Sequence, residues 1–428
     1  MQAYGLSGLT FTAPSGATVA ADGSGTTIAL IEAYHDPTLA ADVQAFDQTY
    51  NLPAPSLNVV DLAGSTSDPT WSLEESLDVE WAHAIAPGAN IVVVEAPSQN
   101  MASIRSAINT ARNMPTVDVI SMSLGFPEST YHGSLNLTTP PGHTGITFVA
   151  ASGDNGLASG SSWPAVSPNV LAVGGTTLYL DAAGNYASEV SWAGSGGGLS
   201  KYVAEPRYQR SISSAGRRIT PDVSFLGDPN TGVAVYQTDP SSGLGSWQIV
   251  GGTSLGTPAW AAIIAIADEG RILQGKGTLD GPSQTLPTLY SLPPSDFHQI
   301  ASYRAGKPAM MGLGSPVGGP LIAGLVGSDI EVPLTVSSAR TAAFRAQRVR
   351  FRRAFLEAPR HRHLAQPHHL AARVAIHAVP TIRTALESGR HAADRAANPR
   401  FPFADLLDAL PWNHRSAKNR GSQALSNV

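Results

Sequence analysis

The chain has 428 residues, of which 42% are apolar and only 14% are charged, so it can bury a sizeable core in one large or two ordinary domains. It contains no cysteine, which excludes disulfides, thiolate metal sites and cysteine nucleophiles, and no segment reaches the roughly 18 uninterrupted apolar residues of a membrane helix. Residues 1–330 hold 26 acids and 11 bases, a net charge of −15, whereas residues 331–428 hold 6 acids and 16 bases, a net charge of +10. This reversal predicts a boundary near residue 330.

Between residues 26 and 327, apolar segments of strand length alternate with helical patterns. The predicted strands are residues 27–31, 91–94, 117–122, 146–150 and 170–173, and the predicted helices are residues 72–86, 101–113 and 254–269. Unbroken runs of Val, Ile and Ala indicate strands that are covered on both faces, which is typical of a parallel sheet. We therefore predict the α/β fold class, a doubly wound, mostly parallel sheet with helices on both faces and a site at the carboxyl ends of its strands.

The predicted helix 72–86 carries a pair of acids. Glu74 and Asp78 are four residues apart and therefore share a face of the helix. Such a pair can hold one proton between its members and can accept the proton of a serine in acid, where a histidine would already be charged. An ordinary solvated acidic face is the structural alternative, and Glu75, three residues from Asp78, is not excluded as the partner by spacing. His83 falls roughly on the opposite face from Glu74 and is interpreted as structural.

An aspartate follows one of the predicted buried strands. Asp154 ends the segment Ala151-Ser152-Gly153-Asp154, directly after the strand 146–150. A protonated aspartate in this turn could donate a hydrogen bond to an oxyanion, whereas an ionised one would repel it. The alternative interpretation is an Asx turn without a chemical role.

A serine opens the third predicted helix. In Gly252-Thr253-Ser254, a glycine turn delivers Ser254 to the start of an apolar helix, where free backbone N–H groups and the helix dipole can stabilise an oxyanion. We place Pro258 in the first turn, where its missing N–H costs little. An ordinary Ser/Thr N-cap is the alternative, because a serine nucleophile also needs a base.

The histidine base of ordinary subtilases is not visible. The first strand leads into residues 32–36, Glu-Ala-Tyr-His-Asp, without an Asp-Thr/Ser-Gly string, and no His-Gly-Thr-His string occurs. The nearest string, His-Gly-Ser at residues 132–134, is interpreted as a surface loop. These absences argue against a conventional subtilase.

In combination, the three motifs resemble the sedolisin family, the serine-carboxyl peptidases. The matching strings are Glu74-x-x-x-Asp78 with residues 84–89, residues 151–154, and Gly252-Thr253-Ser254 with Pro258, supported by residues 196–200, 220–224 and 312–316. The resemblance covers residues 3–327 and implies a subtilisin-like fold and a serine-type endopeptidase that works through an acyl-enzyme at acid pH. The roles it implies are Ser254 as nucleophile, Glu74 as base, Asp78 as support for Glu74, and Asp154 in the oxyanion hole. An inactive or unfoldable relative that only binds peptides or proteins is the alternative.

The resemblance also implies partners and a metal. We expect peptide or protein substrates, an extracellular location, a monomer, and neither nucleic acid nor membrane as partner, although residues 1–5 show no signal peptide. The family's calcium site uses two aspartates, but Gln299 stands at the first position and residues 308–311 at the second. Calcium binding is therefore expected to be weak or absent, although Ile300 could still offer its carbonyl. Leu124 stands where some members have tryptophan, so an extended hydrogen-bond network there is not expected.

Two regions follow from these observations. Residues 1–327 are predicted to form a sedolisin-like peptidase domain that starts without the family's pro-segment. Residues 328–428 are predicted to form a basic, poorly ordered C-terminal extension rich in Arg, His, Ala and Pro, with five arginines within residues 345–353. A basic arm for an anionic partner and an out-of-frame translation product are the alternatives.

Overall fold

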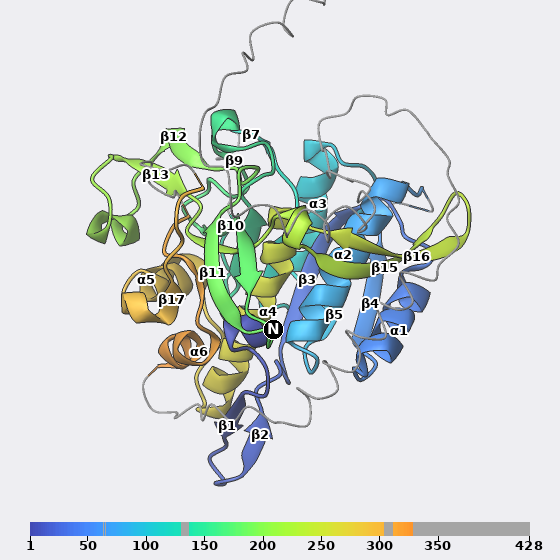
Figure 1. Ribbon diagram of the computed structural model, residues 1–428, viewed down its shortest axis with the longest axis horizontal. Coiled ribbons are helices and arrows are strands. Elements are labelled where there is room, and N and C mark those ends of the chain that lie inside the picture. Colours follow the sequence, from blue (N-terminus) through green and yellow to red (C-terminus); the bar gives the residue numbers. More distant parts are fainter. Residues whose placement is uncertain (63, 65, 130–136, 304–310, 328–428) are drawn as a thin grey trace, which may run out of the picture. The chain divides into compact units, whose positions relative to one another are not determined.

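The computed structural model describes residues 1–62, 64, 66–129, 137–303 and 311–327. An eight-stranded sheet has the order β11-β10-β8-β6-β3-β5-β4, and β14 also pairs with β10 (Figure 1). The mutually parallel strands are β3 (Thr27–Ala33), β4 (Ser56–Asp61), β5 (Asn90–Ala96), β6 (Val119–Met122), β8 (Thr147–Ala151), β10 (Val170–Leu180) and β14 (Val223–Leu226). The last strand, β11 (Tyr186–Ser191), runs antiparallel to β10.

Helices cover both faces of this sheet. α3 (Met101–Arg112) packs on β3, β5 and β6 at one face, whereas α2 (Pro69–Ile85) and α4 (Thr253–Leu273) pack together on the other (Figure 1). Within β3, Ile28 and Leu30 belong to the core under α2 and α4, and Ala29 and Ile31 belong to the core under α3. The strands are buried on both faces because each face has its own helices. The predicted fold class is therefore confirmed.

Every predicted strand and helix is present, with differences of one to four residues at most ends, but the strand predicted at residues 170–173 continues to Leu180. Three strands of the sheet, β4, β11 and β14, were not predicted. β4 lies at the edge of the sheet, where only Leu57 and Val60 are half-buried and the other residues are exposed. An edge strand needs no unbroken apolar run, so its sequence does not carry the signal that identified the central strands.

Smaller elements surround the sheet. α1 (Leu39–Tyr50) packs on α2, and α5 (Leu286–Leu289) and α6 (Gly318–Val326) lie near the end of the described chain. Antiparallel ribbons join β1 (Thr10–Thr12) to β2 (Thr18–Ala20), β7 (Phe126–Pro127) to β9 (Ser162–Trp163), β12 (Gly198–Ala204) to β13 (Arg217–Thr220), β15 (Val233–Asp239) to β16 (Leu244–Val250), and β17 (Phe297–His298) to β18 (Ser315–Pro316).

Some predictions fall outside the residues that the structure describes. These are the basic extension at residues 328–428 and the string at residues 132–134, so both interpretations stay predictions. In the described part of the chain, no helix is long and apolar enough to cross a membrane.

Candidate active site

The acid-bearing helix α2 is buried along most of its length. Asp68 caps its N-terminus, and its carboxylate accepts hydrogen bonds from the Thr70 N–H at 2.9 Å and the Trp71 N–H at 3.2 Å. Because α2 packs against α4 and the sheet, Glu74 is only 6% exposed and Asp78 is 0% exposed. The two acids therefore do not form a solvated helix face.

Ser254 is the second residue of α4 and lies against the acids of α2. The turn before it contains Gly252 with a φ of 107°, and a Cβ atom there would lie 2.8 Å from Asp154 Oδ2, so the turn requires glycine. The Ser254 hydroxyl lies beside the Glu74 carboxyl group and opposes the rise in the pKa of Glu74. The fold thus brings the predicted nucleophile and the predicted base into contact.

Pro258 lies in the second turn of α4, so its predicted place in the first turn was wrong. The helix begins at Thr253, and the proline ring removes the N–H that would have bonded the Ser254 carbonyl four residues earlier. The Ser123 hydroxyl lies 3.3 Å from that free carbonyl and 2.9 Å from Asp78 Oδ1, and can donate to either. The missing helical bond is thus replaced by a contact that links the start of α4 to Asp78.

A third buried carboxyl, which was missed in the sequence, completes the acid cluster. Glu32 is 0% exposed near the carboxyl end of β3, and its carboxyl group lies beside that of Asp78, whose charge raises the pKa of Glu32. Two carboxyl groups can hydrogen-bond each other only when one of them carries a proton. The acid placed to share a proton with Asp78 is therefore Glu32, while Glu74 faces Ser254. The signal that could have identified Glu32 is its place at the end of the first sheet strand.

Asp154 faces the turn that precedes Ser254. Its Oδ1 accepts hydrogen bonds from the Thr253 N–H and the Thr253 hydroxyl, both at 2.8 Å, and the Thr253 Oγ1 accepts one from the Gly153 N–H at 3.1 Å. Burial raises the pKa of Asp154, and the two bonds from Thr253 oppose that rise. The charge of Asp154 also raises the pKa of Glu74, so the three sequence motifs meet at one place.

This place is the carboxyl edge of three adjacent strands. Glu32 lies near the end of β3, Ser123 directly follows β6, and Asp154 follows β8, and these strands are neighbours in the order β8-β6-β3. The helices α2 and α4 supply the remaining side chains. The site therefore occupies the position expected for a doubly wound sheet.

Burial is the main reason that these acids hold protons unusually well. It raises the pKa of Asp78 to about 7, against the opposing hydrogen bonds of Ser123 and Glu32. It raises the pKa of Glu74 well above the usual range, and the charge of Asp78 adds to the effect. For Glu32, burial and the charges of its acidic neighbours act in the same direction. The cluster therefore keeps protons at pH values where exposed acids have lost them.

Two further residues of α2 have other surroundings. The His83 Nε2 lies 2.8 Å from the Pro53 carbonyl oxygen and 3.4 Å from Asp47 Oδ1, which agrees with the structural role expected for it. The Glu75 carboxyl hydrogen-bonds Glu95 of β5. From spacing alone, either Glu74 or Glu75 could have been the acid that pairs with Asp78. The acid that lies beside Ser254 is Glu74.

The calcium position expected from the sequence has a neutral side chain. Gln299 is exposed, and its amide lies 3.5 Å from the Pro294 carbonyl, to which it donates. Ile300 is half-buried, and residues 308–310 lie outside the described part of the chain. The side chain of Gln299 lacks the carboxylate charge that is typical of calcium sites, so the weak or absent calcium binding expected from the sequence stays a prediction.

Comparisons with known proteins agree with this geometry. The Subtilase family matches residues 62–272. Kumamolisin from Bacillus sp. (strain MN-32) is 33% identical over 357 residues, which cover 72% of this chain and 61% of kumamolisin. The solved structure of Pseudomonas sedolisin, a serine-carboxyl proteinase complexed with two molecules of pseudo-iodotyrostatin, matches with a TM-score of 0.60 at 26% identity, covering 71% of this chain and 92% of that chain.

The chain belongs to the sedolisin family. Sedolisin from Pseudomonas sp. (strain 101) is also 28% identical over 302 residues, which cover 62% of this chain and 50% of that protein. The chain thus spans between half and about three fifths of the length of these curated relatives. The family resemblance seen in the sequence is confirmed, together with the subtilisin-like fold that it implied.

One position of this sedolisin-family chain limits the hydrogen-bond network around Asp78. Leu124 follows Ser123 and is buried in the core under α3. A leucine has no polar atom with which to extend the network beyond Ser123.

Proposed function

We propose that this chain is a serine-carboxyl endopeptidase that hydrolyses peptide bonds through an acyl-enzyme on Ser254 and works best in acid. The observation that carries the proposal is the place of the Ser254 hydroxyl beside the buried carboxyl group of Glu74, where it opposes the rise in the pKa of Glu74. A nucleophile within reach of a base is the arrangement that covalent catalysis requires. Because the base is a carboxylate, its working pH is set by acids and not by an imidazole.

In the first half of the proposed reaction, Glu74 accepts the proton of Ser254 while Oγ attacks the carbonyl carbon of the scissile bond. The carbonyl oxygen becomes an oxyanion, to which a protonated Asp154 donates a hydrogen bond. The C–N bond then breaks, and Glu74 returns its proton to the leaving amine. In the second half, water takes the place of the amine: Glu74 accepts its proton and the hydroxyl group adds to the acyl carbon. The bond between this carbon and Ser254 Oγ then breaks, and Glu74 returns the proton to Oγ, which frees Ser254 and the acid product.

Asp78 and Glu32 act on the base in this proposal. When Glu74 takes up the serine proton, its carboxyl group becomes neutral and its repulsion with the charge of Asp78 disappears. That charge therefore makes Glu74 a stronger base, in agreement with the rise in its pKa. The proton between Glu32 and Asp78 limits the negative charge that the buried cluster must hold.

The pH dependence of turnover tests the proposal. A protonated Asp154 is needed for the oxyanion, and burial raises the pKa of this group, so its contribution is complete in acid and is lost as the pH rises through that pKa. We expect kcat/KM on one peptide substrate, measured from about pH 2 to 9, to have its maximum on the acid side. It should fall towards neutrality as Asp154 loses its proton, and fall again at the acid end as the base Glu74 becomes protonated. Circular dichroism at each pH separates this fall from unfolding.

The variant Asp154→Asn sharpens the same test. Its amide donates a hydrogen bond at any pH, so kcat/KM should be lower than in the wild type at acid pH but should fall less as the pH rises. A maximum at neutral or alkaline pH, with no activity in acid despite an intact fold, would falsify the carboxylate mechanism. A steep fall that persists in Asp154→Asn would remove Asp154 from the explanation.

We further propose that calcium is not needed at the position where the family has its metal. The neutral side chain of Gln299, in place of a carboxylate, supports this proposal. No step of the mechanism above uses a metal.

A further inference from the structure

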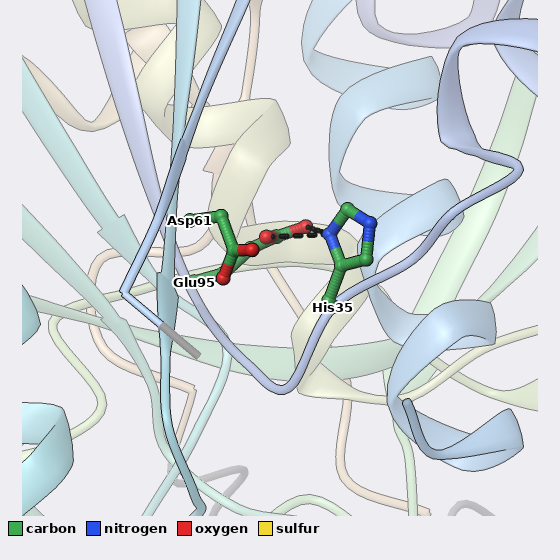
Figure 2. Close-up of side chains that lie close together, drawn as sticks. All are labelled: His35, Asp61 and Glu95. Atoms are coloured by element: carbon green, nitrogen blue, oxygen red, sulfur yellow. Dashed lines mark hydrogen bonds and ion pairs between the residues drawn. The ribbon is translucent and has the colours of Figure 1, made fainter. Parts of the chain in front are cut away.

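A histidine and two carboxylates converge at the carboxyl ends of β3, β5 and β4. His35 follows β3, Glu95 lies in β5, and Asp61 ends β4. One potential ligand atom from each residue lies within 4.8 Å of the other two, and Figure 2 shows the three side chains turned toward one another. The His35 Nδ1 lies 3.0 Å and 2.8 Å from the two oxygens of the Glu95 carboxylate. Imidazole nitrogen and carboxylate oxygen are the ligand types of zinc and manganese sites.

A buried acid beside this group is a second, independent observation. Glu75 is 1% exposed, it lies beside Glu95, whose charge raises its pKa, and its Oε1 has no hydrogen-bond partner. Glu95 is itself 0% exposed. Two neighbouring carboxyl groups at one side of the group are therefore out of water. Such an excess of buried negative charge needs protons or a cation.

The accessibility of the group differs from one side to the other. Asp61 is exposed and the His35 side chain is 29% exposed, so an ion can enter from solvent and keep water ligands there. Glu75, which is buried beside Glu95, can help to hold Glu95 in place, as outer carboxylates do in metal sites. The backbone N–H of Asp36 adds a hydrogen bond to Glu95 at 3.3 Å.

We propose that His35, Asp61 and Glu95 bind one divalent transition-metal ion, with Zn²⁺ or Mn²⁺ as the expected ions, at a site separate from Ser254. The imidazole ligand favours these ions over calcium and magnesium, which prefer oxygen alone. Binding requires His35 to give up its hydrogen bond to Glu95 so that both side chains face the metal. The ion would tie the edge strand β4 to β5 and β3, and this proposal does not depend on the peptidase activity.

Isothermal titration calorimetry of the full chain with ZnCl₂ and with MnCl₂ tests the site. The titration is made near pH 7, where an ordinary imidazole is mostly neutral. The variants are Asp61→Asn and His35→Gln, and the control is Asp181→Asn. Asp181 is a matched control because, like Asp61, it is exposed and accepts a hydrogen bond from a turn N–H.

The proposal predicts one binding event in the wild type and in Asp181→Asn that is at least about tenfold weaker in Asp61→Asn and in His35→Gln. The histidines of residues 328–428 are the same in all four proteins, so they add a common background. Anomalous diffraction from a crystal soaked in the same ion should show a peak between His35, Asp61 and Glu95.

Two results would overturn the metal site. Equal titrations in all four proteins, with no anomalous peak at the group, would mean that no ion binds there. A missing binding event combined with a higher KM of Asp61→Asn for substrates that carry lysine or arginine would instead make the group a recognition site for a cationic substrate side chain.

Discussion

Two buried aspartates of this fold, Asp222 and Asp78, have opposite surroundings, although both are 0% exposed. Asp222 Oδ2 lies 2.6 Å from the Nη2 of Arg218, which is itself fully buried. Its Oδ1 accepts further hydrogen bonds from Gln209 at 3.1 Å and from Tyr290 at 2.7 Å. The charge of Asp222 is therefore matched by a cation and by polar donors.

Asp78 has a different set of neighbours. Its hydrogen bonds come from the Ser123 hydroxyl and from another acid, Glu32, and burial raises its pKa to about 7. A compensated carboxylate can stay ionised inside the protein, whereas a cluster of acids must bind protons to stay buried. Burial alone therefore does not decide whether an acid of this fold is ionised or holds a proton, because the charge of the nearest partner also contributes.

The largest effect on activity is expected from Ser254→Ala. Loss of the nucleophile should lower kcat on the order of 10⁶-fold, since nucleophile and base act as a unit, while the acid cluster and the fold remain. Hydrolysis of denatured casein at acid pH, with matched circular dichroism spectra, measures this. Ser211→Ala, at an exposed serine, is the control and should keep wild-type activity. Substantial turnover by Ser254→Ala would end the serine-peptidase proposal and leave a binding module as the alternative.

The largest effect on stability is expected from the ion pair between Asp222 and Arg218. Arg218→Met leaves Asp222 buried without its cation, so the free energy of unfolding should fall by about 3–5 kcal/mol. Urea denaturation measures the change. The neighbouring Arg217 is exposed and bonds the Tyr202 carbonyl, so Arg217→Met should change stability by less than about 0.5 kcal/mol. Similar losses in the two variants would show that charge compensation at Asp222 is not the cause.

The buried acids Glu32, Glu74 and Asp78 should make the stability of the protein depend on pH. An acid whose pKa is raised by folding stabilises the protein fully below its unfolded pKa and loses that contribution as the pH rises through the folded pKa. For Asp78 this window runs from about 4, the ordinary value, to about 7. We therefore expect the Tm to fall across this window, and to fall less in Glu32→Gln, which removes one titrating group.

Differential scanning calorimetry from about pH 4 to 8 measures this slope. Asp181→Asn removes an exposed acid outside the cluster and should keep the wild-type slope. If the Tm of Glu32→Gln falls with pH as steeply as the Tm of the wild type, a proton shared between Glu32 and Asp78 does not control stability.

The smallest change in stability is expected from the addition of calcium. Because Gln299 offers a bonded amide and no carboxylate, addition of millimolar CaCl₂ should leave the Tm of the full chain within about 1 °C, since only a ligand that binds the native state raises it. Differential scanning fluorimetry with and without CaCl₂ is sufficient. A rise of several degrees would show that other acids bind calcium in this chain.

The active-site motifs differ in how much could be predicted from the sequence. Asp154 and Ser254 each follow a turn after a strong secondary-structure signal, so their place at the end of a strand and the start of a helix was predictable. The choice between Glu74 and Glu75 was not, because residues three and four positions from Asp78 both share its helix face. Glu32 was missed because a single acid at the end of an apolar strand has no spacing pattern.

The sequence by itself determined the fold class, the family and the order of the three motifs, because buried parallel strands need unbroken apolar runs and tight turns need glycine. The tertiary structure decided which acids touch each other and Ser254. It paired Glu32 with Asp78, turned Glu75 toward Glu95, and exposed the edge strand β4. The physical reason is that proton affinity and proton sharing depend on burial and on distances between side chains from different strands and helices, which no local pattern records.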